Sequence, residues 1–247
     1  MNKPYLVTVA SYTDGVKRFY ESLVHIKNQI EHVHISFEPA IPYFKPWKKH
    51  EEEYCGNLKR LDHIPLLDDK RFIIFSDTDD VVFQRPFPDL ERMQYEVYVG
   101  NENVKHVDSY WKPFIERNPY FQPLMERTVY NGGLFAMRYG IFKKYMAFVK
   151  EFTKWVAPED LGQADQLLFN LFFVKQPYYD VYAGLDIFCP LYRNLEIKSV
   201  YVKKGLFILS DGHVPVAVHG NGNTKGVLDD GRKMDKISKF RKKKNEV

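Results

Sequence analysis

The chain alternates between short apolar runs, which predict strands, and longer stretches with apolar residues at helical spacing, which predict helices. Strands are expected at residues 6–10, 33–37, 72–75, 95–99, 133–138, 197–202, 206–210 and 214–218. Helices are expected from a cap at Thr13 through Ile30, and over residues 50–61, 141–155 and 160–174. The strand–helix–strand order in the first part of the chain is typical of parallel βαβ units. We therefore predict an α/β fold with a Rossmann-like, mostly parallel central sheet flanked by helices.

Two of the predicted helices carry apolar residues that could pack against such a sheet. In the helix at 141–155, one apolar face reaches from Ile141 to Trp155 and is expected to lie in the core. In the helix at 160–174, the run from Leu167 to Phe169 is also expected to be buried. A proline-rich loop is expected at 39–46.

One predicted strand ends directly in acidic residues. The continuous apolar run Phe72–Phe75 predicts a strand buried on both faces, and Asp77, Asp79 and Asp80 follow it at once. Open α/β sheets bind their ligands at the carboxyl ends of the strands. Because Asp77 and Asp79 are two residues apart, a tight turn can direct both carboxylates to one divalent cation that keeps open positions for substrate phosphates. The simpler alternative is a turn that only caps the strand, and for Asp80 we expect a turn or supporting role.

Size and charge narrow the class of protein. With 247 residues, of which 45% are hydrophobic, the chain is expected to form one large domain. The net charge of +4 is unevenly spread, since residues 231–247 contain eight basic and two acidic residues and the rest of the chain is slightly acidic. Proteins that grip nucleic acid usually carry a basic face on the folded body, so no specific nucleic-acid partner is expected. The tail at 229–247 is interpreted as a solvated end, a linker to a further domain, or a weak contact to an anionic surface.

The sequence shows neither a membrane-spanning segment nor a secretion signal. No run of about 18 apolar residues occurs, so no membrane span is predicted. The first residues lack the apolar core of a signal peptide, which favours a cytoplasmic protein. Cys55 and Cys189 lie far apart and offer no zinc spacing, so both thiols are expected to be free.

Four segments, taken in order, resemble the motifs of one enzyme family. They are Asp77-Thr78-Asp79, Tyr130-Asn131-Gly132-Gly133, Asp165-Gln166-Leu167-Leu168-Phe169-Asn170 and the segment from His219 to Lys225. They are similar to the DxD, F-N-[SA]-G, D-Q-D-x-x-N and H-x-x-G-x-x-K motifs of retaining GT-A glycosyltransferases, the group that contains glycogenin and bacterial lipopolysaccharide galactosyltransferases. The resemblance spans roughly residues 5 to 226, and the chain departs from it at Leu167, where the family has a second Asp.

This resemblance implies a fold, a cofactor and a set of site residues. It implies a GT-A domain over residues 1–228, with a small additional sheet near a metal site. The metal, Mn²⁺ or Mg²⁺, would be held by Asp77, Asp79 and His219. Asp165 would bind hydroxyls of the donor sugar, and Gln166 would lie near the reacting carbon. The nucleotide-sugar donor would be contacted by Ala10, Tyr12, Arg60, Thr78, Asn131, Gly222 and Lys225.

Several of these residues also have a purely structural interpretation. His219 could be a buried, hydrogen-bonded histidine at a strand end, and Arg60 could be an exposed helix residue. Asn131 could belong to an Asn-Gly-Gly turn before a strand. Among the donor contacts, Tyr12 would stack on uracil, Gly222 would let the backbone approach the phosphates, and Lys225 would supply a point charge.

The function implied is transfer of a hexosyl or deoxyhexosyl group from a UDP-sugar to a hydroxyl of a glycan or glycoprotein, with retention. The chain also resembles the first domain of large chlorella-virus glycosyltransferases that build capsid glycans, which would place it in the host cytoplasm with further domains after the tail. One alternative is a sugar-nucleotide nucleotidyltransferase, although residues 11–18 contain one Gly and no Gly-rich phosphate loop. Others are a glycosyltransferase acting on modified DNA bases and a non-catalytic nucleotide- or glycan-binding module.

Overall fold

The computed structural model describes residues 3–10, 14–36, 64–78, 80–156, 160, 164–203, 205–220 and 228. The predicted helix at 50–61, the proline-rich loop at 39–46 and the tail at 229–247 lie outside these residues. No helix in the described part of the chain combines the length and the apolar character needed to cross a membrane.

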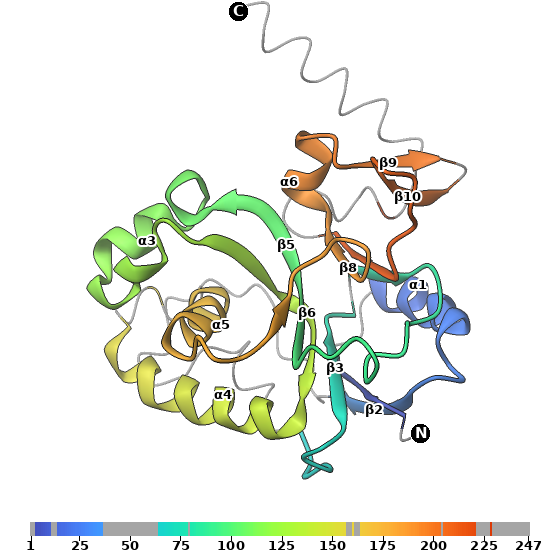
Figure 1. Cartoon of the computed structure of the whole chain (residues 1–247), viewed down its shortest axis with the longest axis horizontal. Coiled ribbons are helices and arrows are strands. Elements are labelled where there is room, and N and C mark those ends of the chain that lie inside the picture. Colours follow the sequence, from blue (N-terminus) through green and yellow to red (C-terminus); the bar gives the residue numbers. More distant parts are fainter. Residues whose placement is uncertain are drawn as a thin grey trace, which may run out of the picture.

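A six-stranded sheet in the order β2-β1-β3-β6-β5-β7 forms the centre of the fold (Figure 1). Its strands are β1 (Tyr5–Ala10), β2 (Glu31–Ser36), β3 (Phe72–Ser76), β5 (Val97–Lys105), β6 (Thr128–Arg138) and β7 (Val181–Tyr182). β2, β1 and β3 are parallel, and β7 is parallel to β5. β6 runs antiparallel to both of its neighbours, β3 and β5. The predicted α/β fold with a mostly parallel central sheet is therefore confirmed.

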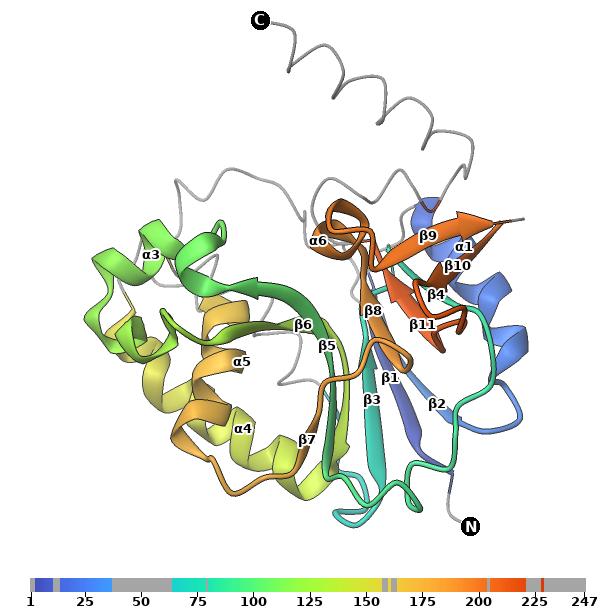
Figure 2. The same cartoon turned by 45° about the horizontal axis from the view of Figure 1, so that its top comes forward.

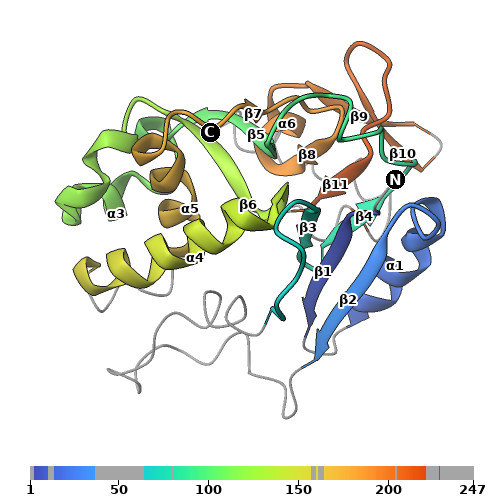
Figure 3. The same ribbon diagram turned by 60° about the horizontal axis from the view of Figure 1, so that its bottom comes forward.

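Helices cover both faces of this sheet (Figure 3). α4 (Tyr139–Phe152) and α5 (Ala164–Lys175) lie on one side, and α1 (Asp14–Ser22) lies on the other. Phe75 and Ile73 belong to the core cluster on the α4 and α5 side, while Phe72 and Ile74 belong to the cluster that contains Phe19 of α1. All five residues of β3 are buried, so this strand is covered on both faces, as its apolar run predicts.

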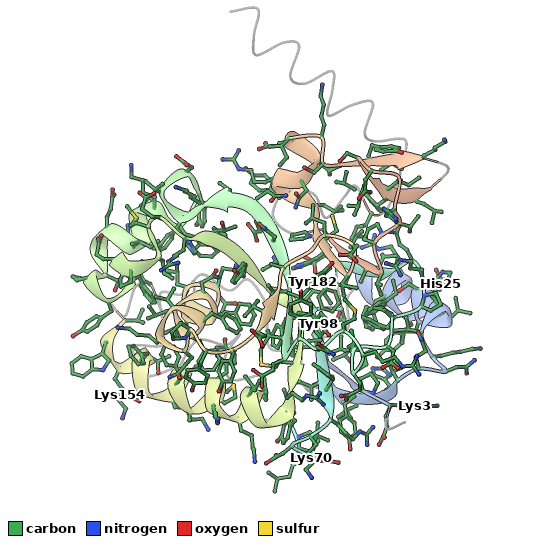
Figure 4. The ribbon with its side chains drawn as sticks, viewed as in Figure 1. Lys3, His25, Lys70, Tyr98, Lys154 and Tyr182 are labelled. Carbon is green, nitrogen blue, oxygen red and sulfur yellow. The ribbon has the colours of Figure 1, made fainter. Side chains whose placement is uncertain are left out.

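Aromatic rings fill much of the space between the sheet and its helices. Phe135 of β6 stacks on Phe75 with ring centroids 5.2 Å apart, and it contacts Phe169 of α5 at 4.9 Å. Near the edge of the sheet, Tyr98 of β5 and Tyr182 of β7 pack together with centroids 5.9 Å apart (Figure 4). The buried run Leu167–Phe169 confirms the core position expected for it.

A smaller sheet lies on the α1 side of the central sheet (Figure 2). It consists of β4 (Val81–Phe83), β11 (Ala217–His219) and β8 (Phe188–Pro190), with β11 in the middle, antiparallel to β4 and parallel to β8. α6 (Leu191–Glu196) and the hairpin of β9 (Val200–Lys203) and β10 (Leu206–Leu209) follow it, and α3 (Lys112–Arg117) lies after β5. β5 passes so close to β8 that a Cβ atom on Gly100 would lie 2.8 Å from Cδ of Pro190. An additional small sheet was expected from the family resemblance, and one is present.

Some element boundaries differ from the sequence prediction. The first helix ends at Ser22 and continues as a 3₁₀ turn, although Ile26 and Ile30 are buried as a longer helix would bury them. α4 likewise ends at Phe152, and the following 3₁₀ turn leaves Trp155 57% exposed rather than in the core. Apolar spacing does not distinguish a helix from a compact turn that buries the same residues, as at Ile26 and Ile30, and it does not show where a helix ends, as before Trp155.

Near the candidate motifs, the boundaries shift as well. Residues 130–133 lie inside β6 rather than in a turn before it, because β5 pairs with Tyr130 and Asn131 and β3 pairs with the residues that follow from Leu134. The helix predicted at 160–174 begins at Ala164 as α5. β9 begins at Val200 rather than at 197, after α6, and β11 covers 217–219 rather than 214–218.

Candidate metal centre

Asp77, Asp80 and His219 gather at the carboxyl end of β3. Each offers one ligand atom, and these three atoms all lie within 4.8 Å of one another. Nε2 of His219 is 3.2 Å from Oδ1 of Asp80 and 3.8 Å from Oδ2 of Asp77. His219 and Asp80 are buried, and Asp77 is half-buried, so the cluster opens to solvent on the Asp77 side.

The backbone fixes both ends of the acidic turn. The amide of Asp77 donates to the carbonyl oxygen of Gly133 at 2.8 Å, which joins the start of the turn to β6. The amide of Gly220 donates to the carbonyl oxygen of Asp80 at 2.6 Å, which joins its end to β11. Directly after the turn, Val81 of β4 pairs with His219 of β11. Pairing between β4 and β11 therefore sets the position of Asp80 beside the imidazole.

Two residues of the predicted ligand set, Asp77 and His219, lie together in the structure, whereas Asp79 lies outside the described residues. Asp80, which we expected in a turn or supporting role, contributes a carboxylate oxygen to the cluster. Asp80 is placed by the strand that follows it, β4, and this strand could have been the signal in the sequence. With three residues, β4 is too short to show a pattern there.

Opposing effects act on the imidazole of His219. Burial alone would lower the pKa of His219, because it disfavours the charged ring. The charge of Asp80, its hydrogen bond to the ring and the charge of Asp77 outweigh burial, so the pKa of His219 is raised. In the protein alone, the two carboxylates thus favour the protonated form of the ring. A bound divalent cation would replace this positive charge, since two carboxylate oxygens and one imidazole nitrogen form a donor set that suits Mn²⁺.

Gly133 provides the space in which the cluster forms. A Cβ atom at this position would lie 2.5 Å from Oδ2 of Asp77 and 2.5 Å from Cε1 of His219. Real Cβ atoms do not approach other heavy atoms so closely, so any larger residue would displace one of the two ligand side chains. Gly133 is therefore a requirement of the site.

Asn131 connects the imidazole to a second carboxylate. Its Oδ1 atom lies 2.7 Å from Nδ1 of His219 and accepts a hydrogen bond from the amide of Gly133 at 3.1 Å. Its Nδ2 atom donates to Oε1 of Glu102 in β5 at 3.0 Å. Asn131, Glu102 and His219 are all buried. No residue type in the segment that contains Glu102 is diagnostic, so the sequence did not indicate this contact.

α5 holds the motif region of β6 in place. Gln166 accepts a hydrogen bond from the amide of Gly132 at 2.9 Å and donates one to the carbonyl oxygen of Tyr130. Asn170 accepts from the amide of Tyr130 at 2.7 Å and donates to its carbonyl oxygen at 2.8 Å. Asp165, in the first turn of α5, is half-buried beside this contact. The Gln and Asn of the third motif thus bind the backbone of the second.

The remaining predicted residues are only partly described. Ala10 is the last residue of β1 and pairs with Ser36 of β2. Thr78, which follows Asp77, is buried. Tyr12, Arg60, Gly222 and Lys225 lie outside the described residues. The described parts of all four motif segments therefore meet at one end of β3.

A cavity of about 780 Å³ lies at the other end of β3, the end that holds Lys70 (Figure 4). Its charged groups largely bind one another or their neighbours. Lys143 contacts Asp69 at 2.6 Å, and Arg138 contacts Glu91 at 2.6 Å. The lining of this cavity includes the carboxylates of Asp69 and Glu96 but no histidine, and Asp69 is paired with Lys143. The acidic end of β3, where two carboxylates meet an imidazole, is therefore the better candidate for a reactive site.

The chain matches no family model and no curated protein. The functional interpretation consequently depends on the residues and their geometry.

Proposed function

We propose that this protein is a metal-dependent glycosyltransferase of the GT-A type, with its catalytic domain over residues 1–228. It would move a sugar from a UDP-sugar to a hydroxyl group of a glycan or protein acceptor, with retention at the anomeric carbon. The observation that carries the proposal is the meeting of Asp77, Asp80 and His219 at the carboxyl end of β3. Open α/β sheets bind nucleotides at this end.

The residues present fit a divalent cation of the Mn²⁺ or Mg²⁺ class. Asp77 and Asp80 would supply carboxylate oxygens, and His219 would supply the lone pair of Nε2. Gly133 leaves the space that these side chains need. When bound, the cation supplies Lewis-acid stabilisation of the negative charge that develops on the departing diphosphate.

The protein itself would contribute positioning and electrostatic stabilisation. Gln166 is an amide whose two ends bind the backbone of Gly132 and Tyr130, so it offers no nucleophile. We therefore favour displacement on one face of the sugar. The bond from the anomeric carbon to the phosphate oxygen breaks as the acceptor oxygen bonds to the same face. The acceptor's proton passes to the departing phosphate oxygen. By the family resemblance, Asp165 would orient the sugar hydroxyls.

Turnover of a panel of UDP- and GDP-sugars with and without Mn²⁺ tests this function. The wild-type protein should release UDP from at least one donor in a Mn²⁺-dependent reaction. Asp77→Asn should lower that rate by roughly 100-fold or more, because one ligand of the charge-stabilising cation is lost. Asp211→Asn is the matched control, since its carboxylate is exposed and outside the cluster.

Three outcomes would contradict the proposal. Equal Mn²⁺-stimulated turnover in wild type and Asp77→Asn would remove the metal from the mechanism. Release of pyrophosphate from UTP and a sugar phosphate would instead identify a nucleotidyltransferase. Tight binding of UDP-sugars without turnover on any acceptor or water would identify a binding module.

A further inference from the structure

The hairpin of β9 and β10 carries apolar residues on both of its faces. The inner face packs onto the small sheet, since Val200, Phe207 and Leu209 belong to the same core cluster as Val218 of β11. Residues that oppose each other in an antiparallel pair lie on one face, and the faces alternate along each strand. The register therefore places four other residues on the outer face: Tyr201, Lys203, Leu206 and Ile208.

The outer face is more apolar than its position explains. Sheet faces in contact with water usually carry polar side chains, whereas three of these four residues are apolar. Tyr201 is 41% exposed, Leu206 is 42% exposed and Ile208 is half-buried. The hairpin stands at the edge of the molecule, beyond the small sheet (Figure 2). A Cβ atom on Gly205, in its turn, would meet only its chain neighbours within 4 Å, so the tip projects into solvent.

Positive charge accompanies this apolar face. Lys203 lies on the face, opposite Leu206, and Lys198 lies in the turn that leads into β9. Among the described residues, neither lysine pairs with a carboxylate. Leu228 packs against the core cluster beneath the hairpin, and the tail at 229–247, with eight basic and four acidic residues, follows it directly in the sequence. Exposed apolar side chains and basic residues are thus combined in one part of the protein.

We propose that the outer face of the β9–β10 hairpin docks the protein onto a membrane surface with anionic head groups. Apolar side chains such as those of Tyr201 and Leu206 bind at the boundary between head groups and acyl chains, and basic residues beside them are attracted to anionic lipids. Tyrosine suits this boundary because its ring is apolar and its hydroxyl is polar. Stable attachment takes two signals, and here these are the apolar face and the basic residues.

Size and charge favour a membrane over a protein partner. A stable protein interface buries about 800 Å² on each partner and involves roughly 20 to 30 residues a side, whereas this face has four residues. A second copy of the hairpin would also bring the lysines of both copies together. A bilayer sets no such requirement, because a few side chains can enter it while the lysines keep their charged ends at the head groups.

Sedimentation of the full chain with lipid vesicles tests the proposal. The wild type should bind vesicles that contain phosphatidylserine and phosphatidylcholine, and should bind much more weakly to phosphatidylcholine alone. Leu206→Ser should weaken binding to the anionic vesicles by roughly 10-fold, because it removes an apolar side chain from the bilayer. Lys203→Gln should weaken it by about 5-fold, as expected for one lysine near an anionic surface.

Two matched variants carry the same changes elsewhere. Leu66→Ser alters a leucine that is 91% exposed and precedes β3, and Lys27→Gln alters an exposed lysine that follows α1. Both should bind the anionic vesicles with the affinity of the wild type. Leu206→Ser should unfold at the same denaturant concentration as the wild type, because its side chain lies outside the core cluster. Lys203→Gln keeps the test decisive where Leu206→Ser folds poorly.

Three results would overturn the proposal. The first is a wild-type protein that does not bind anionic vesicles. The second is equal binding of the wild type, Leu206→Ser and Lys203→Gln, which would assign the attachment to another part of the chain. The third is a dimer, seen by light scattering, that dissociates in Leu206→Ser, because a second copy would then cover this face. None of these assays contains a donor sugar or a metal, so their outcome does not depend on the proposed function.

Discussion

Oδ1 of Asp80 lies 3.2 Å from Nε2 of His219, although the two residues come from distant parts of the chain. Their contact follows from the pairing of β4 with β11, which places Val81 opposite His219. Asp80 is therefore part of the candidate metal centre, whereas its position after Asp77-Thr78-Asp79 suggested a supporting role.

Asp80→Asn should weaken Mn²⁺ binding by at least about 10-fold, because it replaces a charged ligand with a neutral amide at a buried position. Isothermal titration with Mn²⁺ measures the affinity. Asp211→Asn, which removes an exposed carboxylate, should bind Mn²⁺ with the affinity of the wild type. An unchanged affinity in Asp80→Asn would show that Asp80 does not bind the metal.

Gly133→Ala should disrupt the site from the side of β6. The added Cβ would overlap both Asp77 and His219, so we expect a loss of Mn²⁺ affinity and about 1–3 kcal/mol of stability. Gly140→Ala is the matched control, because the nearest atom to its Cβ is the carbonyl oxygen of Asp69 at 3.4 Å. Its stability should change by less than about 0.5 kcal/mol. Denaturant unfolding gives both values, and equal effects of the two substitutions would contradict the packing described for Gly133.

His106 should make the stability of the protein depend on pH. Burial lowers the pKa of His106, and its hydrogen bond to the carbonyl oxygen of Arg127 offsets this only in part. Below about pH 6.5, the unfolded chain gains a proton at this histidine that the folded protein resists. Above that pH, His106 therefore does not lower the free energy of unfolding, and below it the free energy of unfolding falls as the pH drops.

The free energy of unfolding, measured in denaturant at pH 5, 6, 7 and 8, tests this sign. His106→Gln should flatten the acid side of the profile by up to about 1.4 kcal/mol per pH unit. A His106→Gln profile parallel to that of the wild type would mean that His106 has the same pKa in both states.

Cys189 should resist alkylation in the folded protein. Its side chain is fully buried, and burial raises the pKa of its thiol to about 12. The reactive thiolate is thus scarce at pH 8. Mass spectrometry after iodoacetamide treatment should find the peptide with Cys189 unmodified in the native protein and modified after unfolding. Rapid modification of Cys189 in the native protein would contradict its burial.

The sequence could predict those features that depend on local pattern. The run Phe72–Phe75 gave a strand buried on both faces, since only a strand covered on each side is apolar at every position. The site was predictable in part because Asp77 and His219 stand in recognisable motifs. Asp80 and Glu102 were not, because their roles depend on strand pairings between distant segments. β4 is three residues long, and Glu102 meets Asn131 through the neighbouring strands β5 and β6.

Apolar spacing alone predicted two helix ends wrongly. Ile26 and Ile30 are buried by a 3₁₀ turn and the loop after it, and Trp155 leaves the core because α4 stops at Phe152. These boundaries depend on where the chain must turn to meet the next strand, and that is decided by the packing of the whole domain.

The most direct test of the central claim is a crystal structure of the protein with Mn²⁺ and UDP, with the metal located by its anomalous scattering. The account predicts one Mn²⁺ roughly 2.0–2.4 Å from a carboxylate oxygen of Asp77, a carboxylate oxygen of Asp80 and Nε2 of His219, with the diphosphate on its open side. A metal bound elsewhere, or UDP bound away from the carboxyl end of β3, would contradict it.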